Sequence, residues 1–227
     1  MVIALVLSGG TGMRMGMEIP KQYIEVAGKR IIDYCLEAVQ NCNVIERIHI
    51  VAESQWAEVL NLKKYSKYQG MSQPGRTRQE SVLHGLNDIS SYAAEDDIVV
   101  VHDAARPLVT GRLLEELIET IKGHDGVIPV LPMKDTVYFS EDGQKITSLL
   151  ERECIYAGQA PEAFRLGTYL KANKVLTETE LLKINGSTEP AFMSGLDVVM
   201  IPGDKRNFKI TTREDLFCFE KMVHEKV

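Results

Sequence analysis

The chain has 227 residues, 44% of them hydrophobic and 26% charged, and its formal net charge is −6 at pH 7. This length and composition suit one globular α/β domain spanning residues 1–227 better than two full domains. An acidic total argues against a protein that grips nucleic acid along its backbone, because such proteins usually carry a basic face.

The N-terminus and the cysteines indicate the compartment. The apolar run at residues 2–7 is far too short to span a bilayer, and no basic segment precedes it. The four cysteines form no CxxC pair and no cluster with histidine, so we expect no zinc site and free thiols in a reducing compartment. We therefore expect a cytoplasmic protein with no membrane partner.

Apolar runs and helical periodicity alternate along the chain. Short apolar runs predict strands at residues 2–7, 48–51, 97–101, 126–130 and 197–201. Apolar residues at helical spacing predict helices at residues 31–39, 58–64, 79–88, 110–121, 165–176 and from 212 onward, with Thr110 and Thr212 as N-caps. The alternation implies an α/β fold with a Rossmann-like, mostly parallel sheet and helices on both faces.

One segment departs from this alternation. Residues 133–152 alternate polar and apolar side chains on either side of the turn Glu141-Asp142-Gly143. This pattern is typical of a β-hairpin. We expect it to be an arm inserted into the α/β pattern, and residues 133–152 are called the arm below.

The loop after the first strand carries glycines and cations. It runs from Ser8 through Gly9, Gly10, Thr11 and Gly12 to Arg14, and Lys21 follows shortly after. Glycines let backbone N–H groups turn toward phosphate oxygens, and the two cations can neutralise a triphosphate as charge builds on the leaving group. The loop matches neither the P-loop pattern nor G-x-G-x-x-G, so a dinucleotide-binding oxidoreductase is a remote alternative.

A second polar loop, residues 102–107, also follows a buried strand. Ligands of such sheets bind at the carboxyl ends of strands, so the architecture brings both loops to one edge. Asp103 is our candidate for a Mg²⁺ ligand, because magnesium takes one or two carboxylates together with phosphate oxygens and water. Arg106 can pair with Asp103 or with substrate. His102 fits a structural imidazole better than a catalytic base.

Two further segments carry cations but are weak signals alone. Residues 75–81 place a glycine, two arginines and a serine at the start of a helix, whose N-terminus favours anions. Residues 207–211 contain the single cation Lys209 after the last predicted strand.

At these residues the chain resembles the cytidylyltransferase family that includes 2-C-methyl-D-erythritol 4-phosphate cytidylyltransferase and ribitol-5-phosphate cytidylyltransferase. The likeness runs essentially end to end, and several dispersed motifs occur in one order. These motifs are Arg14-Met15, Pro20-Lys21-Gln22-Tyr23, Gly75 with Arg78 and Ser81-Val82, 101–107, Asp135-Thr136, Arg152, 159–164 and 207–211.

The resemblance implies transfer of CMP from CTP to a small polyol phosphate, with release of pyrophosphate. It implies that the backbone of residues 8–12 holds the triphosphate and that Arg14 and Lys21 stabilise the transition state at the α-phosphorus. It assigns Mg²⁺ to Asp103. The nucleotide-binding residues that it adds are Gly75, Arg78, Ser81 and Ala104.

The resemblance also implies how the acceptor is bound. Arg106, Thr136 and Arg152 would bind the acceptor phosphate, together with Lys209, which would also lie near the α-phosphate. In the family the arm reaches over a neighbouring subunit, so Thr136 and Arg152 would serve the partner's site. We therefore expect a homodimer.

The chain departs from the family pattern near the acceptor. Ala160 stands where a threonine is usual, and residues 185–192 read Asn-Gly-Ser-Thr-Glu-Pro-Ala-Phe where methylerythritol enzymes usually carry Thr-Asp-Asp/Glu-Ala-Ser. The acceptor therefore stays open among methylerythritol phosphate, ribitol phosphate and another polyol or glycerol phosphate.

Two other functions fit parts of the pattern. A nucleotidyltransferase for sugar 1-phosphates that uses another NTP would conflict with the pyrimidine-selective pocket expected around residues 75–81. A non-catalytic nucleotide-binding regulator would not need Arg14, Lys21, Asp103 and Lys209 together.

Overall fold

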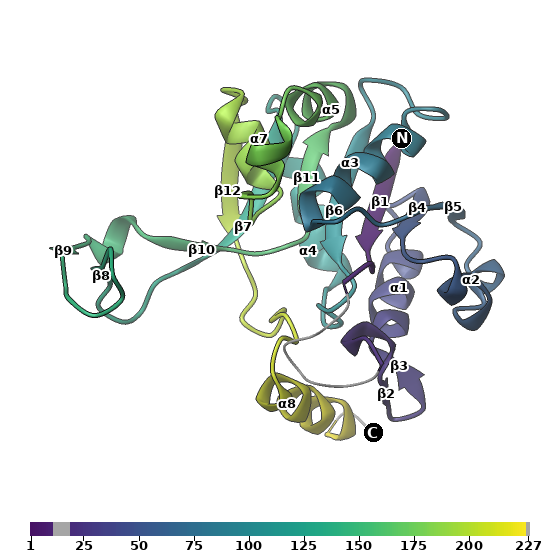
Figure 1. Ribbon diagram of the computed structural model, residues 1–227. Helices are drawn as coiled ribbons and strands as arrows, with labels where there is room; N and C mark the ends of the chain where they lie inside the picture. The colour runs from purple at the N-terminus through teal and green to yellow at the C-terminus, as the bar shows by residue number, and fades with distance from the viewer. Residues whose placement is uncertain (11–18, 226–227) are drawn as a thin grey trace.

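The protein, seen in a computed structural model that describes residues 1–10 and 19–225, is built around a mixed, mainly parallel sheet (Figure 1). Its strands are β1 (Val2–Leu7), β4 (Arg47–Val51), β5 (Tyr68–Ser72), β6 (Ile98–Asp103), β7 (Gly126–Pro132), β10 (Tyr156–Gly158), β11 (Glu162–Arg165) and β12 (Val198–Pro202). The strand order is β10-β7-β11-β6-β1-β4-β5, and β12 also pairs with β7. The predicted α/β fold is confirmed.

The sheet is parallel through β5, β4, β1 and β6, and β12 runs parallel to β7. Three of its strands, β5, β10 and β11, were not predicted. β11 lies between β6 and β7 and runs antiparallel to both, and β10 pairs antiparallel with β7. β11 places Glu162 opposite Val101, directly behind the polar loop that follows β6.

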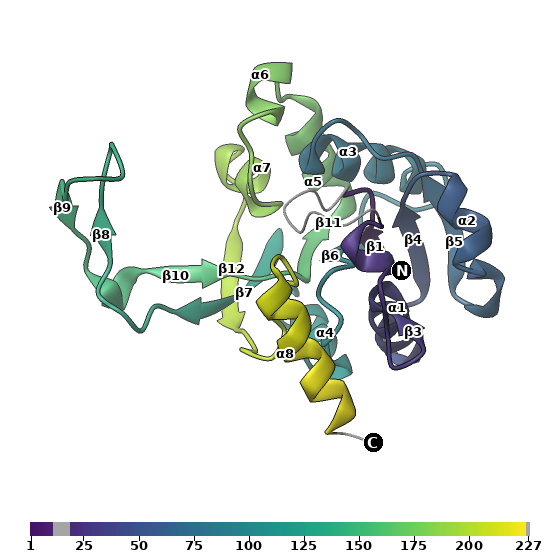
Figure 2. The same cartoon turned by 60° about the horizontal axis from the view of Figure 1, so that its bottom comes forward.

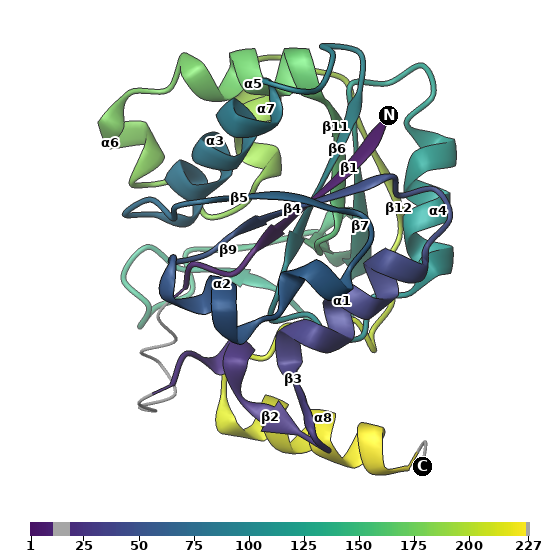
Figure 3. The ribbon, with the colours of Figure 1, turned by 90° about the vertical axis from the view of Figure 1, so that its right-hand side faces the viewer.

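Helices cover both faces of the sheet (Figure 3). The described α-helices are α1 (Ile31–Asn41), α2 (Gln55–Val59), α3 (Arg78–Ile89), α4 (Gly111–Thr120), α5 (Leu166–Lys174), α6 (Glu178–Leu181), α7 (Thr188–Met193) and α8 (Arg213–His224). Because side chains alternate along a strand, Ala4 and Val6 of β1 pack in the cluster that contains α1 and α4 residues, while Ile3 and Leu5 pack in the cluster that contains α3 and α5 residues. Burial on both faces explains the uninterrupted apolar run of β1.

The two predicted N-caps are confirmed. The Thr110 side chain accepts a hydrogen bond from the Leu113 N–H, and Thr212 forms a reciprocal capping box with Asp215. The helix predicted at residues 58–64 is wrong in extent. α2 ends at Val59 and a 3₁₀ turn follows it, because Asn61 adopts a left-handed φ of 45° that a continuing α-helix does not allow.

The predicted hairpin is present within the arm. Its strands, β8 (Tyr138–Phe139) and β9 (Ser148–Leu149), pair antiparallel and stand away from the central sheet on the extensions of β7 and β10 (Figures 1 and 2). Apolar side chains on it are exposed to solvent, including Leu149 at 71%. A smaller hairpin of β2 (Glu25–Val26) and β3 (Lys29–Arg30) precedes α1. In the part of the chain that the structure describes, no helix is long and apolar enough to cross a membrane.

A buried histidine ties β4 to β5 and gives the fold a pH dependence. His49 Nε2 lies 2.8 Å from Ser72 Oγ, and Nδ1 lies 3.1 Å from the Tyr92 hydroxyl. The Ser72 hydroxyl donates to Asp88, so it accepts from His49 Nε2–H. Burial lowers the pKa of His49 from 6.5 to about 4.

Acidification is therefore expected to destabilise the protein through His49. Between pH 6.5 and 4 the unfolded chain takes up a proton at His49 that the folded protein does not, so stability falls as pH falls, by up to about 1.4 kcal/mol per pH unit. Urea unfolding at pH 7, 6 and 5 measures this slope. His49→Gln should make this slope less steep by up to about 1.4 kcal/mol per pH unit, and an unchanged slope in that variant would contradict the assignment.

Candidate active site

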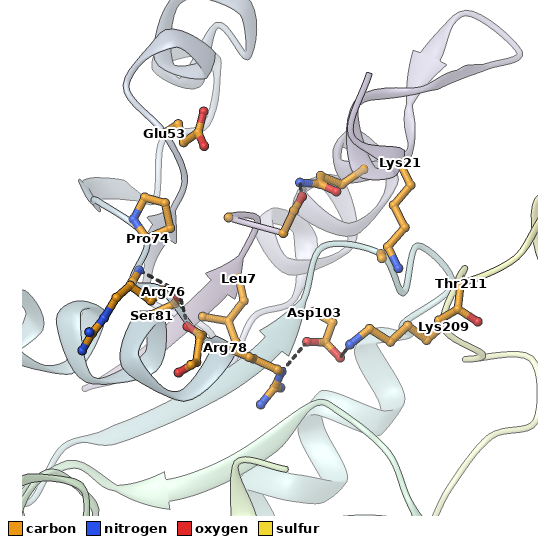
Figure 4. A pocket seen from close by; sticks show the side chains of 16 residues that line it. Leu7, Lys21, Glu53, Pro74, Arg76, Arg78, Ser81, Asp103, Lys209 and Thr211 are labelled. Atoms are coloured by element: carbon orange, nitrogen blue, oxygen red, sulfur yellow. Dashed lines mark hydrogen bonds and ion pairs between the residues drawn. The ribbon is translucent and has the colours of Figure 1, made fainter. Parts of the chain in front are cut away.

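A cavity of about 680 Å³ opens at the carboxyl ends of β1 and β6 (Figure 4). Residues from both predicted polar loops line it, together with residues from the start of α3 and the loop after β12. The predicted site residues among its lining are Gly9, Gly10, Lys21, Gly75, Arg78, Ser81, Asp103 and Lys209. The structure thus brings four distant segments to one site.

The motif that contains Lys21 fixes the start of the glycine-rich loop. Gln22 Nε2 donates to the carbonyls of Ser8 and Gly10, at 2.7 and 2.8 Å. The Ser8 hydroxyl hydrogen-bonds the Tyr23 hydroxyl at 2.9 Å. Ser8 and Tyr23 are buried behind the cavity wall, whereas Gln22, also largely buried, lines the cavity. Lys21 lies in the 3₁₀ turn that carries this clamp and points its side chain into the cavity (Figure 4).

Three predicted nucleotide or catalytic residues, Thr11, Gly12 and Arg14, lie outside the described residues. The described part of the loop packs closely against the segment after β5. A Cβ at Gly9 would collide with the side chain of Pro74. The glycine at this position therefore permits the contact that closes one side of the cavity.

The turn before α3 is shaped by a glycine and a serine. A Cβ at Gly75 would lie 2.9 Å from the backbone carbon of Glu80, so a side chain does not fit there. The Gly75 N–H donates to Ser81 Oγ at 2.9 Å, and the same hydroxyl donates to the Thr77 carbonyl at 2.8 Å. Thr77 caps α3 by accepting the Glu80 N–H. These bonds hold the backbone of the turn along the cavity wall.

Asp103 lies at the centre of a cluster of cations (Figure 4). Its carboxylate oxygens lie 3.0 Å from Arg78 Nε, 2.9 Å from Lys209 Nζ and 3.6 Å from Arg106 Nε. Burial alone would raise the pKa of Asp103, but Arg78 and Lys209 outweigh burial and hold the pKa well below its ordinary value. Asp103 is therefore ionised throughout the physiological range.

The loop that carries Lys209 is fastened to the sheet by buried polar side chains. Arg106 Nη1 donates to the Asn207 carbonyl at 2.8 Å, and Asn207 Nδ2 donates to the Ala160 carbonyl at 2.8 Å. Gln159 holds the same loop through the Asp204 backbone, donating to its carbonyl and accepting from its N–H, both at 3.1 Å. The 159–164 motif therefore helps to place Lys209 beside Asp103.

Other predicted residues lie away from the cavity. Ala104 is buried and its N–H donates to the Leu7 carbonyl at 3.0 Å, so the neighbouring Ala105 lines the cavity instead. Thr136 and Arg152 lie on the arm, where Arg152 hydrogen-bonds the Lys134 carbonyl. Neither is among the cavity's described lining residues.

His102 has the surroundings of a structural residue. It is fully buried, and its Nε2 lies 3.1 Å from the Arg106 carbonyl. Burial lowers the pKa of His102 to about 4, so the ring is neutral.

Sequence reasoning missed part of the cavity wall and the layer behind it. The added lining residues are Leu7, Gln22, Glu53, Pro74, Arg76, Thr77, Ala105 and Thr211. Buried polar residues such as Glu162 and Ser187 were not singled out either. A signal existed only for Glu162, a charged residue directly before two apolar ones in the 159–164 motif.

Comparison with known proteins gives the same family from sequence. A family model described as 2-C-methyl-D-erythritol 4-phosphate cytidylyltransferase matches residues 2–225. A protein of that name from Geobacter metallireducens is 34% identical and aligns with 100% of this chain and 99% of its own. A ribitol-5-phosphate cytidylyltransferase from Streptococcus agalactiae serotype V is 27% identical, over 98% of this chain and 95% of its own.

Solved structures agree with the sequence comparison. The 2-C-methyl-D-erythritol 4-phosphate cytidylyltransferase of Francisella tularensis is similar with a TM-score of 0.82 and 28% identity, covering 96% of this chain and 97% of its own. A 4-diphosphocytidyl-2C-methyl-D-erythritol synthase is similar with a TM-score of 0.82 and 25% identity, covering 98% of each chain. The match over nearly the whole chain, in sequence and in fold, shows that this protein belongs to the 2-C-methyl-D-erythritol 4-phosphate cytidylyltransferase family.

Proposed function

We propose that this protein is a CTP-dependent cytidylyltransferase, which transfers CMP from CTP to the phosphate of a small polyol phosphate and releases pyrophosphate. The observation that carries this proposal is the cluster of Arg78, Arg106 and Lys209 around one carboxylate, with Lys21 directed into the same cavity. Membership of the family supports the reaction type.

The reaction brings two anions together. An oxygen of the acceptor phosphate attacks the α-phosphorus of CTP in line with the departing pyrophosphate. The acceptor phosphate is already ionised, so the protein needs no general base, and its main tasks are charge neutralisation and alignment. Lys21 and Lys209, which enter the cavity from different segments, are the described side chains to which we assign neutralisation at the α-phosphorus, together with Arg14.

The nucleotide would lie along the two loops at the strand ends. Backbone N–H groups of residues 8–12 would hold the triphosphate. The turn formed by Gly75 and Ser81, with Arg78 at its end, would hold the cytidine. The close packing between Gly9 and Pro74 supports this assignment, because it makes these two loops one continuous wall.

Asp103 fits a Mg²⁺ ion that arrives with the nucleotide. Its ionised carboxylate faces the cavity and attracts cations there, since the ammonium of Lys209 lies 2.9 Å from one of its oxygens. Among the described residues no group of three His, Cys, Asp or Glu could hold a metal, so phosphate oxygens would supply the remaining ligands. When bound, the ion would neutralise charge on the phosphates.

We also propose that the protein works as a homodimer through the arm. Thr136 and Arg152 lie on the arm rather than in the cavity of their own chain, and exposed apolar side chains cover the hairpin. In a dimer each arm would bring Thr136 and Arg152 to the partner's cavity, where they would bind the acceptor phosphate with Arg106.

Substitution on the arm is expected to separate the subunits. Ile146→Glu combined with Leu149→Glu places two charges on side chains that are 63% and 71% exposed, and the protein should then elute as a monomer with little turnover. Size-exclusion chromatography with light scattering measures the mass. Val175→Glu, at a side chain that is 73% exposed on the body, is the matched control and should remain a dimer.

Subunit complementation tests whether sites are shared. Mixing inactive Lys21→Ala and Arg152→Ala proteins should restore about a quarter of wild-type turnover, because half of the dimers are mixed and each has one intact site. No restoration after verified subunit exchange would contradict a shared site.

Base selectivity tests the proposed function itself. Pyrophosphate release is measured with CTP, UTP, ATP and GTP, each with Mg²⁺ and with methylerythritol phosphate, ribitol phosphate, glycerol phosphate or a sugar 1-phosphate. We expect release with CTP and one of the three polyol phosphates. Release only with another NTP and a sugar 1-phosphate would replace the proposal, and CTP binding without turnover on any acceptor would indicate a regulator.

A further inference from the structure

Two elements that contain no predicted site residue, β11 and α7, meet behind the cavity. Glu162 is the first residue of β11, and Ser187 directly precedes α7. Both side chains are buried, Ser187 completely and Glu162 to within 6%. Buried polar groups of this kind need partners, and theirs lead to the cavity.

Ser187 links Arg78 to this buried layer. Arg78 Nη1 donates to Ser187 Oγ at 2.6 Å. The next residue, Thr188, donates its hydroxyl to the buried Glu162 carboxylate at 3.1 Å. The Tyr169 hydroxyl donates to the Ser187 carbonyl at 2.7 Å, which fixes the serine backbone as well. Ser187 therefore offers Arg78 an acceptor whose position is set from several sides.

Arg78 needs such anchors because of where it lies. It is the first residue of α3, where the positive end of the helix dipole disfavours a cation. Asp103 holds Nε and Ser187 holds Nη1. Two contacts on different nitrogens fix the plane of a guanidinium, whereas one contact leaves it free to rotate.

The two hydrogen-bond acceptors of Arg78, Asp103 and Ser187, differ in how many other cations they contact. Asp103 is shared with Lys209 and Arg106, and in the proposed function its oxygens also face a metal ion and phosphates. The Ser187 contact uses another nitrogen and does not depend on those oxygens. It can therefore hold the guanidinium when the Asp103 carboxylate turns to another ligand.

We propose that Ser187 is a positioning residue for this enzyme: its hydroxyl, on a backbone held by Tyr169, fixes the Arg78 guanidinium at the wall of the nucleotide cavity. The inference rests on the proposed function. It means that the divergent segment 185–192 acts on CTP binding through Arg78, in addition to any contact with the acceptor.

Ser187→Ala is the direct test. Loss of a hydrogen bond to a charged group should weaken CTP binding about tenfold, seen both as a raised KM for CTP and by titration calorimetry with CTP alone. The KM for the acceptor should change by less. Ser187→Thr retains the hydroxyl and should restore the wild-type KM. Ser187→Cys, of similar shape with a weakly accepting sulfur, repeats the test if the alanine variant does not fold.

Two controls separate positioning from general loosening. Thr188→Val removes the neighbouring hydroxyl from Glu162 but leaves the contact between Ser187 and Arg78, so its KM for CTP should stay near wild type. In an Arg78→Lys background, Ser187→Ala should raise the KM for CTP no further.

The outcomes are distinguishable. Wild-type CTP affinity in a folded Ser187→Ala protein would overturn the inference, as would an equal loss in Thr188→Val or an additive loss in the Arg78→Lys background. Failure of the wild-type protein to release pyrophosphate from CTP would instead overturn the proposed function, and calorimetry with CTP would still show whether Ser187 acts through Arg78.

Discussion

Lys21→Ala is expected to give a folded protein whose turnover is at least about a hundredfold lower, because one well-placed positive group contributes a few kcal/mol to the barrier of a charged transition state. The fold should survive, since the contacts that fix the loop belong to Gln22 and Tyr23. Initial rates of pyrophosphate release at saturating CTP measure the loss, and circular dichroism measures the fold.

Lys29→Ala is the matched control for this substitution. Lys29 is an exposed lysine whose ammonium pairs with Glu37 at 2.6 Å on the small hairpin before α1. Removing it should leave turnover unchanged, because surface ion pairs contribute little and this one does not line the cavity. Wild-type turnover in a folded Lys21→Ala protein would refute the catalytic role of Lys21.

Asp103→Asn is expected to lower both turnover and stability. The amide keeps the shape but removes the negative charge around which Arg78, Arg106 and Lys209 gather. Leaving these partly buried cations without their buried counter-charge costs up to about 3–5 kcal/mol in unfolding free energy, and loss of the carboxylate also removes the proposed Mg²⁺ ligand. We expect turnover to fall by about a hundredfold or more and the half-saturating Mg²⁺ concentration to rise.

The stability effect of Asp103 has a definite pH dependence. The pKa of Asp103 is held below its ordinary value, so its stabilising effect is present above about pH 4 and is lost as pH falls further. Urea unfolding should therefore show the variant and the wild type converging in acid. Glu37→Gln, which removes a surface carboxylate, should match the wild type throughout. Equal stability of Asp103→Asn and wild type at pH 7 would contradict the account.

Local signals in the sequence were sufficient for much of the fold. The apolar runs of β1 and β6 and the caps at Thr110 and Thr212 depend on residues close in sequence, and the structure has them where they were expected. β11 could not be found in this way. Its four residues gain strand structure by pairing between β6 and β7, and such long-range pairing leaves no local periodicity.

In the candidate site, too, some residues were predictable from local signals and others were placed by long-range contacts. Asp103 and the glycine-rich loop follow directly from strand ends, so their convergence could be predicted. Lys209 follows β12, which pairs with β7 rather than with β6. It reaches Asp103 only because its loop returns across the sheet. The Ile210 N–H donates to the Ala105 carbonyl at 2.9 Å and holds the loop there. Nothing near residue 209 indicates that return, and only the resemblance to a family gave Lys209 a role.

Neither local sequence signals nor the resemblance to a family could predict a role for Ser187. Its importance comes from one hydrogen bond to a residue 109 positions earlier in the chain, and the segment around it departs from the family pattern. A small polar residue in such a segment carries no signal until its partner is seen.

Transfer of isotope from the acceptor tests the central claim most directly. The phosphate of the accepted polyol phosphate is labelled with ¹⁸O and incubated with the protein, CTP and Mg²⁺, and the products are weighed by mass spectrometry. If an acceptor oxygen attacks the α-phosphorus, the CDP-polyol will retain every labelled oxygen and the released pyrophosphate will contain none. Label in the pyrophosphate, or no CDP-polyol from folded protein that binds CTP with any polyol phosphate, would contradict the proposed reaction.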